Sequence, residues 1–315
     1  MVPAVYFCEK MRKFAGMKGT RFVGYMLGIV AAVTYGLNPL FALPLMARGM
    51  DTSSILFFRY VLAIPVIALM MAWRGARFRV PRRQLVILLF LGALMGLSSL
   101  GLFESYRYMD AGIASTLLFV YPVMVAFIMA VFFHEKLTQP VVIAVVLAFG
   151  GITLLYRGED GATLSLLGTM WVFISALTYA LYIVGVNRSG LSRIPTLTVT
   201  FYVLIAGMAV FAVNILWTGT FTAPAGWLGW GSVSCLALLP TALSLVCTTK
   251  AISAIGSTPT AILGAMEPVT ALVIGSTVFG ERLTARSLAG VALILAAVIL
   301  VIAARPRRPR PRSAN

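Results

Sequence analysis

Long apolar runs separated by short polar breaks dominate the chain. Ten such runs, each poor in charge, are divided by arginines, prolines or glycines; they lie at residues 22–44, 52–73, 84–105, 111–133, 139–156, 164–186, 196–217, 227–248, 258–279 and 285–304. A helix needs about 20 apolar residues to cross the hydrocarbon core of a bilayer. The breaks leave no room for a soluble domain. The pattern therefore predicts an all-α integral membrane protein with ten transmembrane helices.

Composition agrees with a protein whose main partner is the lipid bilayer. Hydrophobic residues make up 60% of the 315 positions and charged residues 11%, and the mean hydropathy is +0.98. An ordinary soluble domain has about 25% charged residues. The net charge of +16 does not indicate nucleic-acid binding, because the basic residues are not interleaved with aromatic residues on a polar domain.

The basic residues are distributed unevenly between the breaks. With ten helices and a cytoplasmic N-terminus, nineteen Lys and Arg fall on the cytoplasmic side and five on the far side. The nineteen are Lys10, Arg12, Lys13, Lys18, Arg21, Arg74, Arg77, Arg79, Arg82, Arg83, Lys136, Arg188, Arg193, Lys250, Arg305, Arg307, Arg308, Arg310 and Arg312. Because Lys and Arg resist translocation, we expect both termini in the cytoplasm of a bacterial cell and a multi-pass protein of its inner membrane. Residues 1–21 and 305–315 are the expected cytoplasmic tails, and residues 1–16 read as an extension ahead of a more natural start at Met17.

One stretch occurs twice. A shift of 146 positions brings residues 111–138 onto 257–284 and matches Pro122 with Pro268, while a shift of 144 matches Tyr35 with Tyr179. The chain therefore divides into halves 22–156 and 164–304, joined by a linker at 157–163. Each half holds five helices, and an odd number places the second half upside down in the membrane. Inverted repeats of this kind are common in transporters with a site near the bilayer midplane.

The repeated motifs also indicate a family. The helix endings Glu135-Lys136-Leu137-Thr138 and Glu281-Arg282-Leu283-Thr284, together with Met266-Glu267-Pro268 and Phe57-Phe58-Arg59-Tyr60, resemble the drug/metabolite transporter superfamily, EamA type. The resemblance covers about residues 22–304. It implies an inner-membrane carrier that works by alternating access, often an exporter of amino acids, metabolites or toxic compounds, and it does not imply a substrate.

Two charges fall well inside predicted helices, away from their ends, where each costs about 2.5–3.5 kcal/mol on insertion scales. Arg59 could bind an anionic group of a substrate, such as a carboxylate, or bridge carbonyls or a carboxylate on a neighbouring helix. Glu267 lies beside Pro268, and burial favours the neutral form of a carboxyl group. Glu267 is therefore either a proton-coupling group or a structural, hydrogen-bonded acid.

Other charges lie nearer the helix ends. Glu104 and Lys250, which the repeat aligns, either border the outer and inner vestibules or are interfacial charges that snorkel to the headgroups. Glu135 and Glu281 stand in turns, where we expect them to cap the next helix or to tie the turn to neighbouring elements.

Aromatic and proline residues complete the candidate site. Pro122 and Pro268 should kink their helices near the midplane, and Pro39, Pro65 and Pro240 are read in the same way. The remaining candidates either line a mixed apolar and polar substrate pocket or belong to an aromatic core. They are Tyr35, Asn38, Tyr106, Tyr121, Trp171 and Tyr179.

The sequence contains no evident set of catalytic residues. The lone His134 and the scattered Cys8, Cys235 and Cys247 lack metal-ligand spacing, and no phosphate-binding loop is present, so we expect no metal and no cofactor. The expected function is secondary active export of a small molecule, with an amino acid or related compound favoured and proton coupling as a hypothesis. A carrier of drugs, toxic compounds or other metabolites in either direction, and a structural or lipid-handling membrane protein, stay open, as do a monomer and a homodimer.

Overall fold

The computed structural model describes residues 21–73, 75–76, 78–134, 139–156, 165–189, 191 and 194–304. The regular elements within these ranges are helices. Residues 21–36 form the first helix, followed by α2 (Asn38–Ala47), α3 (Thr52–Trp73), α4 (Arg82–Ser105), α5 (Ala111–Leu118), α6 (Tyr121–Phe133), α7 (Gln139–Tyr156), α8 (Leu166–Arg188), α9 (Thr196–Thr218), α10 (Gly226–Leu236), a π-helix (Ala237–Leu243), α11 (Ser244–Ile255), α12 (Ser257–Leu263), α13 (Met266–Val278) and α14 (Ala285–Ala304). Residues 1–20, the expected linker 157–163, the tail 305–315 and Glu135 lie outside the described residues.

The prediction of an all-helical chain with membrane-spanning helices is confirmed. In the described part of the chain, nine helices are long and apolar enough to cross a membrane, and a shorter apolar helix covers Gln139–Leu155. Two spans are longer than the apolar runs suggested: the first covers Arg21–Ala47 and the eighth Gly226–Ile255. Both contain prolines that interrupt the α-helix without ending the span.

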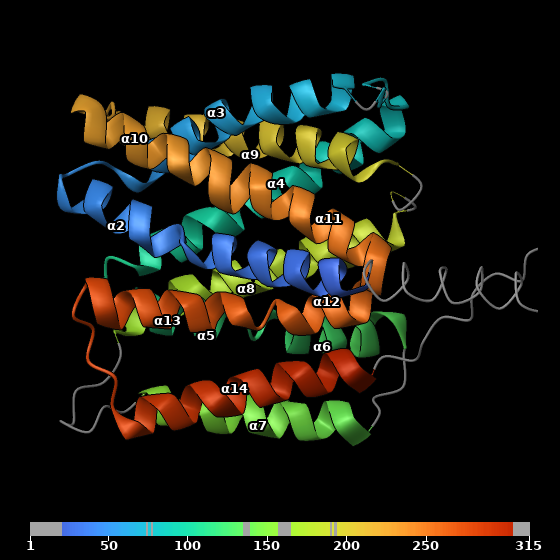
Figure 1. The fold of residues 1–315 in the computed structure, drawn as a ribbon, viewed down its shortest axis with the longest axis vertical. Coiled ribbons are helices and arrows are strands. Elements are labelled where there is room, and N and C mark those ends of the chain that lie inside the picture. Colours follow the sequence, from blue (N-terminus) through green and yellow to red (C-terminus); the bar gives the residue numbers. More distant parts are fainter. Residues whose placement is uncertain are drawn as a thin grey trace, which may run out of the picture.

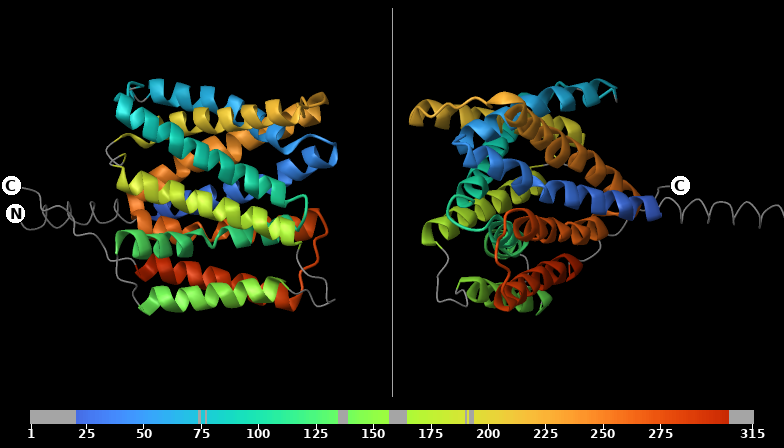
Figure 2. Two further views of the ribbon diagram at one scale, coloured as in Figure 1. Left: turned by 180° about the vertical axis from the view of Figure 1, so that it is seen from behind. Right: turned by 60° about the vertical axis from the view of Figure 1, so that its left-hand side comes forward.

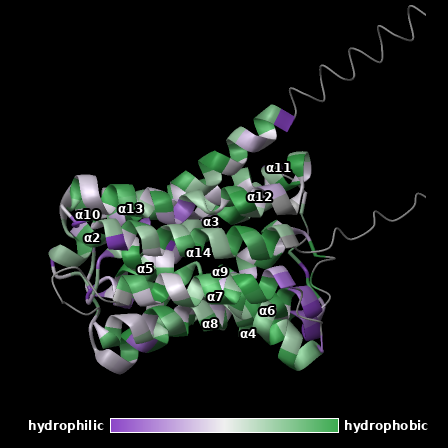
Figure 3. Cartoon of the chain, turned by 90° about the horizontal axis from the view of Figure 1, so that it is seen from below, coloured by the Kyte–Doolittle hydropathy of each residue, from purple (hydrophilic) through white to green (hydrophobic). Residues whose placement is uncertain are grey.

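The helices run side by side between two ends of one bundle (Figure 1). The helix of residues 21–36 begins and α14 ends at the same end, here called the terminal end, and the opposite end is called the distal end (Figure 1). Figure 3 shows hydrophobic residues along the length of the helices and hydrophilic residues gathered at the two ends. Trp73 at the terminal end and Trp217 and Trp227 at the distal end are all more than 80% exposed. Tryptophans favour the interface between lipid and water, so these residues mark its two levels.

Equivalent helices of the two halves pack against each other. The helix pairs α3 and α9, α5 and α13, and α7 and α14 are all in contact, and each joins corresponding spans of the two sequence repeats. Helices α5 and α13 run in opposite directions (Figure 1), while α7 and α14 together form one edge of the bundle (Figure 2). The core is therefore shared between the halves.

Prolines divide four of the spans near their middle. Pro39 and Pro122 lie at the start of α2 and α6, Pro268 lies in the first turn of α13, and Pro240 lies inside the π-helix. Proline has no N–H to donate and its ring clashes with the preceding turn, so a helix tolerates it best in its first turn. Pro65, by contrast, lies inside the continuous helix α3.

Candidate functional site

Arg59 of α3 is buried in the middle of the bundle, with 4% of its surface exposed. Its Nε donates a hydrogen bond of 2.9 Å to Oγ1 of Thr241, and Thr241 in turn donates to the Leu236 carbonyl at 3.1 Å. The guanidinium carbon lies 5.8 Å from the centre of the Phe103 ring, a distance that allows a cation–π interaction. The π-helix and α4 therefore fix the plane of the guanidinium group and leave its terminal nitrogens for other partners.

Glu267 and Tyr35 lie near this guanidinium group. Glu267 is enclosed by protein and lies within electrostatic range of Arg59, and the side chain of Tyr35 is in polar contact with Arg59 and in electrostatic range of Glu267. Glu267 lies in the first turn of α13, where the positive end of the helix dipole stabilises a carboxylate. Tyr35 and Glu267 are each partly exposed.

Tyrosines of both halves lie around these two groups. The rings of Tyr121 and Tyr179 meet edge to face at 4.6 Å, and Tyr179 stacks on Tyr182 at 6.0 Å. Tyr179 lies in electrostatic range of Tyr35 and Glu267. The Tyr106 hydroxyl is 3.3 Å from Oγ of Ser115 and in electrostatic range of Arg59 and Glu267. The centre of the bundle thus holds a guanidinium group and a carboxyl group within an aromatic, hydroxyl-rich wall.

The structure brings most of the expected site residues together. The central cluster, as the name is used below, consists of Tyr35, Arg59, Tyr106, Tyr121, Tyr179 and Glu267. Trp171 precedes Tyr179 by eight positions on α8, which is about two helical turns. Asn38 lies beyond the break at Leu37 and is 3% exposed, and its amide oxygen has no hydrogen-bond partner among the described residues.

Three contributors were missed by the sequence analysis: Thr241, Ser115 and Tyr182. A signal for Thr241 did exist, because it directly follows Pro240 in an otherwise apolar run. A proline in mid-helix frees backbone groups, which a neighbouring polar side chain can satisfy.

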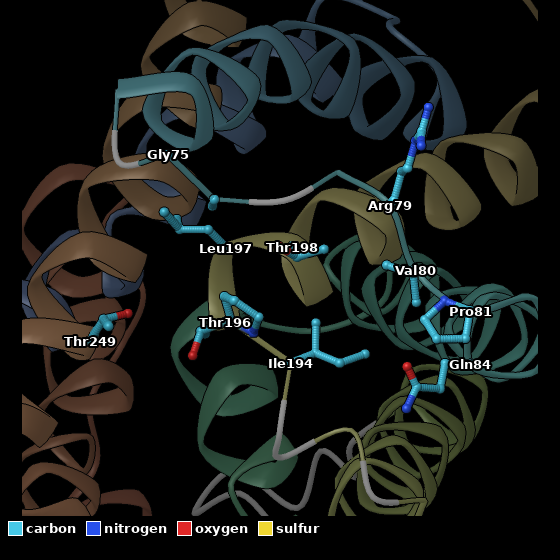
Figure 4. Close-up of a pocket in the computed structure, with 12 residues that line it drawn as sticks. Gly75, Arg79, Val80, Pro81, Gln84, Ile194, Thr196, Leu197, Thr198 and Thr249 are labelled. Carbon is cyan, nitrogen blue, oxygen red and sulfur yellow. The ribbon is translucent and has the colours of Figure 1, made fainter.

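A hollow lies at each end of the bundle. The terminal hollow has a volume of about 530 Å³ and is lined by residues that include Arg79, Gln84, Thr196 and Thr249 (Figure 4). The distal hollow measures about 940 Å³ and is lined by residues from the first, second, third, seventh and ninth spans or the turns that follow them, Tyr106 and Arg107 among them.

The expected vestibule residues lie close to these hollows. Glu104 forms a 3.3 Å ion pair with Arg107 at the distal hollow. Lys250 is exposed and follows Thr249, which lines the terminal hollow. The hollows thus frame the central cluster from opposite ends of the bundle.

Glu281 ties the second half to the first. Gly280, with a φ of +69°, turns the chain after α13, and the Glu281 carboxylate accepts hydrogen bonds from the N–H groups of Ala111 at 2.8 Å and Gly112 at 3.3 Å. Glu281 therefore caps α5 across the repeat, whereas Thr284 caps α14 by accepting from the Ser287 N–H at 3.1 Å. Burial raises the pKa of Glu281 and outweighs the two backbone hydrogen bonds, which lower it. Burial likewise raises the pKa of the neighbouring Asp110.

Known proteins resemble the whole of this arrangement. A solved crystal structure superposes with a TM-score of 0.65 over 88% of this chain and 95% of the other, at 17% sequence identity, which shows a shared fold. The threonine/homoserine exporter RhtA of Escherichia coli is 28% identical over 239 residues, or 75% of this chain and 77% of the relative. The uncharacterized transporter YvbV of Bacillus subtilis is 25% identical over 211 residues, and the match spans 65% of this chain and 66% of that protein.

The family itself follows from its sequence model, which matches twice, once in each half. The two matches cover residues 22–157 and 166–303 and have the description EamA-like transporter family. Together they span nearly all of the apolar part of the chain. The description is that of a transporter family and not of an enzyme family. This chain is a multi-pass membrane protein and belongs to the EamA-like transporter family.

Proposed function

We propose that this protein exports a zwitterionic amino acid, or a closely related metabolite, across the bacterial plasma membrane by alternating access. The observation that carries the proposal is the guanidinium group of Arg59 and the carboxyl group of Glu267, which lie within electrostatic range of each other beside a group of tyrosines. The relative RhtA, whose name describes a threonine/homoserine exporter, supports the same substrate class.

The guanidinium group of Arg59 and the carboxyl group of Glu267 match the carboxylate and the ammonium group of an amino acid. A guanidinium group binds a carboxylate through two parallel hydrogen bonds, so Arg59 would hold the substrate carboxylate. Glu267 would then hold the substrate ammonium group. The tyrosine hydroxyls and rings of Tyr35, Tyr106 and Tyr179 would enclose the remainder of a small substrate.

Proton coupling follows from the same geometry. A carboxylate that binds an ammonium group must be ionised, and a protonated Glu267 has no charge with which to hold it. Glu267 would therefore carry either substrate or a proton, and the two would exchange on opposite sides of the membrane. Such competition couples export to the inward proton gradient without a second site.

The architecture supports alternating access. Breaks at prolines in spans 1, 4, 8 and 9 surround the central cluster, and broken helices at the interface of inverted repeats are typical of secondary transporters. We propose that the ten spans form two inverted five-helix repeats with both termini in the cytoplasm. The terminal hollow would then open to the cytoplasm and the distal hollow to the outside.

Transport in proteoliposomes tests the proposal. Purified protein should show saturable, counterflow-competent movement of radiolabelled L-threonine, and a pH gradient should drive it. Arg59→Gln should abolish this flux, while Arg82→Gln, which removes an exposed guanidinium at the start of α4, should leave it unchanged. Glu267→Gln should retain only weak substrate exchange and should lose the response to the pH gradient. Glu267→Asp should restore part of that response.

Two results would contradict the proposal at different points. Saturable flux of another solute, with L-threonine and other amino acids inactive, would overturn the substrate class and favour a carrier of drugs or other metabolites. The absence of any saturable flux over a broad panel would favour a structural or lipid-handling role. An unchanged pH response in Glu267→Gln would overturn the coupling step alone.

A further inference from the structure

The distal hollow is a preformed chamber whose walls are tied together by hydrogen bonds. Its volume of about 940 Å³ lies within the range of about 300–1,000 Å³ that is usual for small-molecule sites. The start of α3 and the turn at residues 219–222 form one wall: Oγ1 of Thr222 accepts from the Asp51 N–H at 2.8 Å, and Oγ of Ser54 accepts from the Thr222 N–H at 3.0 Å. The Ser54 hydroxyl donates to the Thr220 carbonyl at 3.2 Å. These hydrogen bonds hold the wall in place in the absence of a ligand.

An unpaired polar group is buried in the wall of the hollow. Thr52, the first residue of α3, lines the hollow and is 1% exposed, and its Oγ1 has no hydrogen-bond partner among the described residues. A buried hydroxyl without a partner costs about 1–3 kcal/mol. Such a group is explained when a ligand or an ordered water completes its hydrogen bond.

Opposite charges line the same hollow. Asp51 and Arg107 are both lining residues. Oδ2 of Asp51 accepts from the Ser53 N–H at 3.0 Å, which leaves Oδ1 outside that bond, and Arg107 uses Nη1 for its ion pair with Glu104. Each charged group therefore retains polar atoms for a ligand. A purely anionic ligand would meet Asp51 and a purely cationic one would meet Arg107, so the lining favours a ligand that carries both charges.

Tyr106 connects this hollow to the central cluster. It lines the hollow and also lies in electrostatic range of Tyr35, Arg59 and Glu267. Its ring packs on Phe103 at 5.4 Å, and Phe103 carries the Arg59 guanidinium on its face. Tyr106 therefore lies between the central cluster and the distal hollow.

We infer that the distal hollow is a second binding site for a zwitterionic amino acid, formed by Thr52, Asp51 and Arg107 and separated from the central cluster by Tyr106. The ligand class rests on the proposed function; the existence of the site rests on the hollow itself. Arg107 binds the carboxylate, Asp51 the ammonium group, and the Thr52 hydroxyl completes its hydrogen bond on the ligand. Occupancy from the distal side then slows the release of the next substrate molecule, so external amino acid inhibits export.

Cysteine protection in the full-length protein tests this site directly. Cys8, Cys235 and Cys247 are replaced by alanine, and Thr220→Cys places a thiol in the lining of the distal hollow. L-threonine should slow maleimide labelling of this thiol in nanodiscs at least threefold. Ser165→Cys, at the same end of the bundle but outside the lining, serves as the control and should show no protection.

Variants separate the second site from the central cluster. Protection should persist in Arg59→Gln and should be lost in Thr52→Val and in Arg107→Gln, while Thr52→Ser should retain it. Elution as a single species and an unchanged melting temperature establish that a variant is folded. If Thr52→Val does not fold, the loss of protection is measured in Arg107→Gln, whose substitution is at an exposed position.

Each outcome decides between the two claims. Protection without any amino-acid flux would uphold the distal site and overturn the proposed transport. Flux without protection, or protection that disappears in Arg59→Gln, would overturn the distal site and leave the proposed function standing. Absence of both would overturn the distal site and the proposed amino-acid substrate together.

Discussion

At the scale of single residues, Arg59 shows how a charge is accommodated inside an apolar bundle. Its Nε donates to Thr241, its guanidinium group lies over the face of Phe103, and the Glu267 carboxyl group lies in electrostatic range. None of these contacts uses the full hydrogen-bonding capacity of the guanidinium group, which has five N–H donors. The remaining capacity is what a substrate carboxylate would take up.

Thr241 should therefore act as a positioning residue. Thr241→Val keeps the side-chain volume but removes the hydrogen-bond acceptor, so the guanidinium group of Arg59 loses its fixed orientation. The loss of one hydrogen bond to a charged group is about 1.5–3 kcal/mol, and we expect the KM for L-threonine flux to rise roughly tenfold, the equivalent of about 1.4 kcal/mol. Thr241→Ser should restore the wild-type KM. Thr153→Val, which removes a hydroxyl bonded only within α7, is the matched control, and an unchanged KM in Thr241→Val would contradict this role.

At the scale of helices and turns, the carboxylate of Glu281 links the two halves through the first turn of α5. Because burial raises its pKa, the folded state binds a proton more tightly than the unfolded state does. The contribution of Glu281 to the free energy of unfolding therefore falls as pH rises from the ordinary glutamate pKa of about 4.3 through the raised value.

This linkage predicts a pH-dependent melting temperature. The wild-type protein should gain stability from Glu281 on acidification toward pH 5, by on the order of 2 °C, and Glu281→Gln should lose this part of the slope. Asp110→Asn should also flatten the slope, since burial raises the pKa of Asp110 in the same direction. Melting curves between pH 5 and 8 provide the measurement, and an identical slope in Glu281→Gln and wild type would refute the linkage.

Helices α7 and α14 approach closely through one glycine on each. A Cβ on Gly151 would lie 2.7 Å from the Gly290 carbonyl oxygen, whereas a Cβ on Gly150 would have Leu293 as its nearest neighbour at 3.7 Å. Gly151→Ala should thus destabilise the protein by about 1–3 kcal/mol, as overpacking usually does, and Gly150→Ala should be close to neutral. Thermal unfolding of the two variants compares a clash with backbone against ordinary contact, and equal melting temperatures would show that α14 can move aside.

At the scale of the whole molecule, the sequence predicted an all-helical chain of long apolar spans because apolar length is a strong signal in a membrane protein. It also predicted Arg59 and Glu267 as candidates, since charges in apolar runs are costly. It could not predict that Glu281 caps α5, because that contact joins residues 170 positions apart and depends on how the halves pack. The distal hollow was missed for the same reason: Thr52 and Thr222 are ordinary loop-flanking residues until the turn at 219–222 folds against α3.

The inversion of the two halves can be tested with a single pair of positions. Phe78 follows the second span of the first half and Thr220 the second span of the second half, so the two turns are equivalent in the repeat. Both are exposed, and the C-terminal ends of α3 and α9, which these turns follow, lie at opposite ends of the bundle (Figure 1). In intact cells, a membrane-impermeant maleimide should label Thr220→Cys in a chain otherwise free of cysteine, and should label Phe78→Cys only after permeabilisation. The excess of Lys and Arg at the terminal end sets this direction. Labelling of both thiols from outside would contradict inverted repeats, and labelling of Phe78→Cys alone would keep the inversion but reverse the orientation, turning the distal hollow toward the cytoplasm.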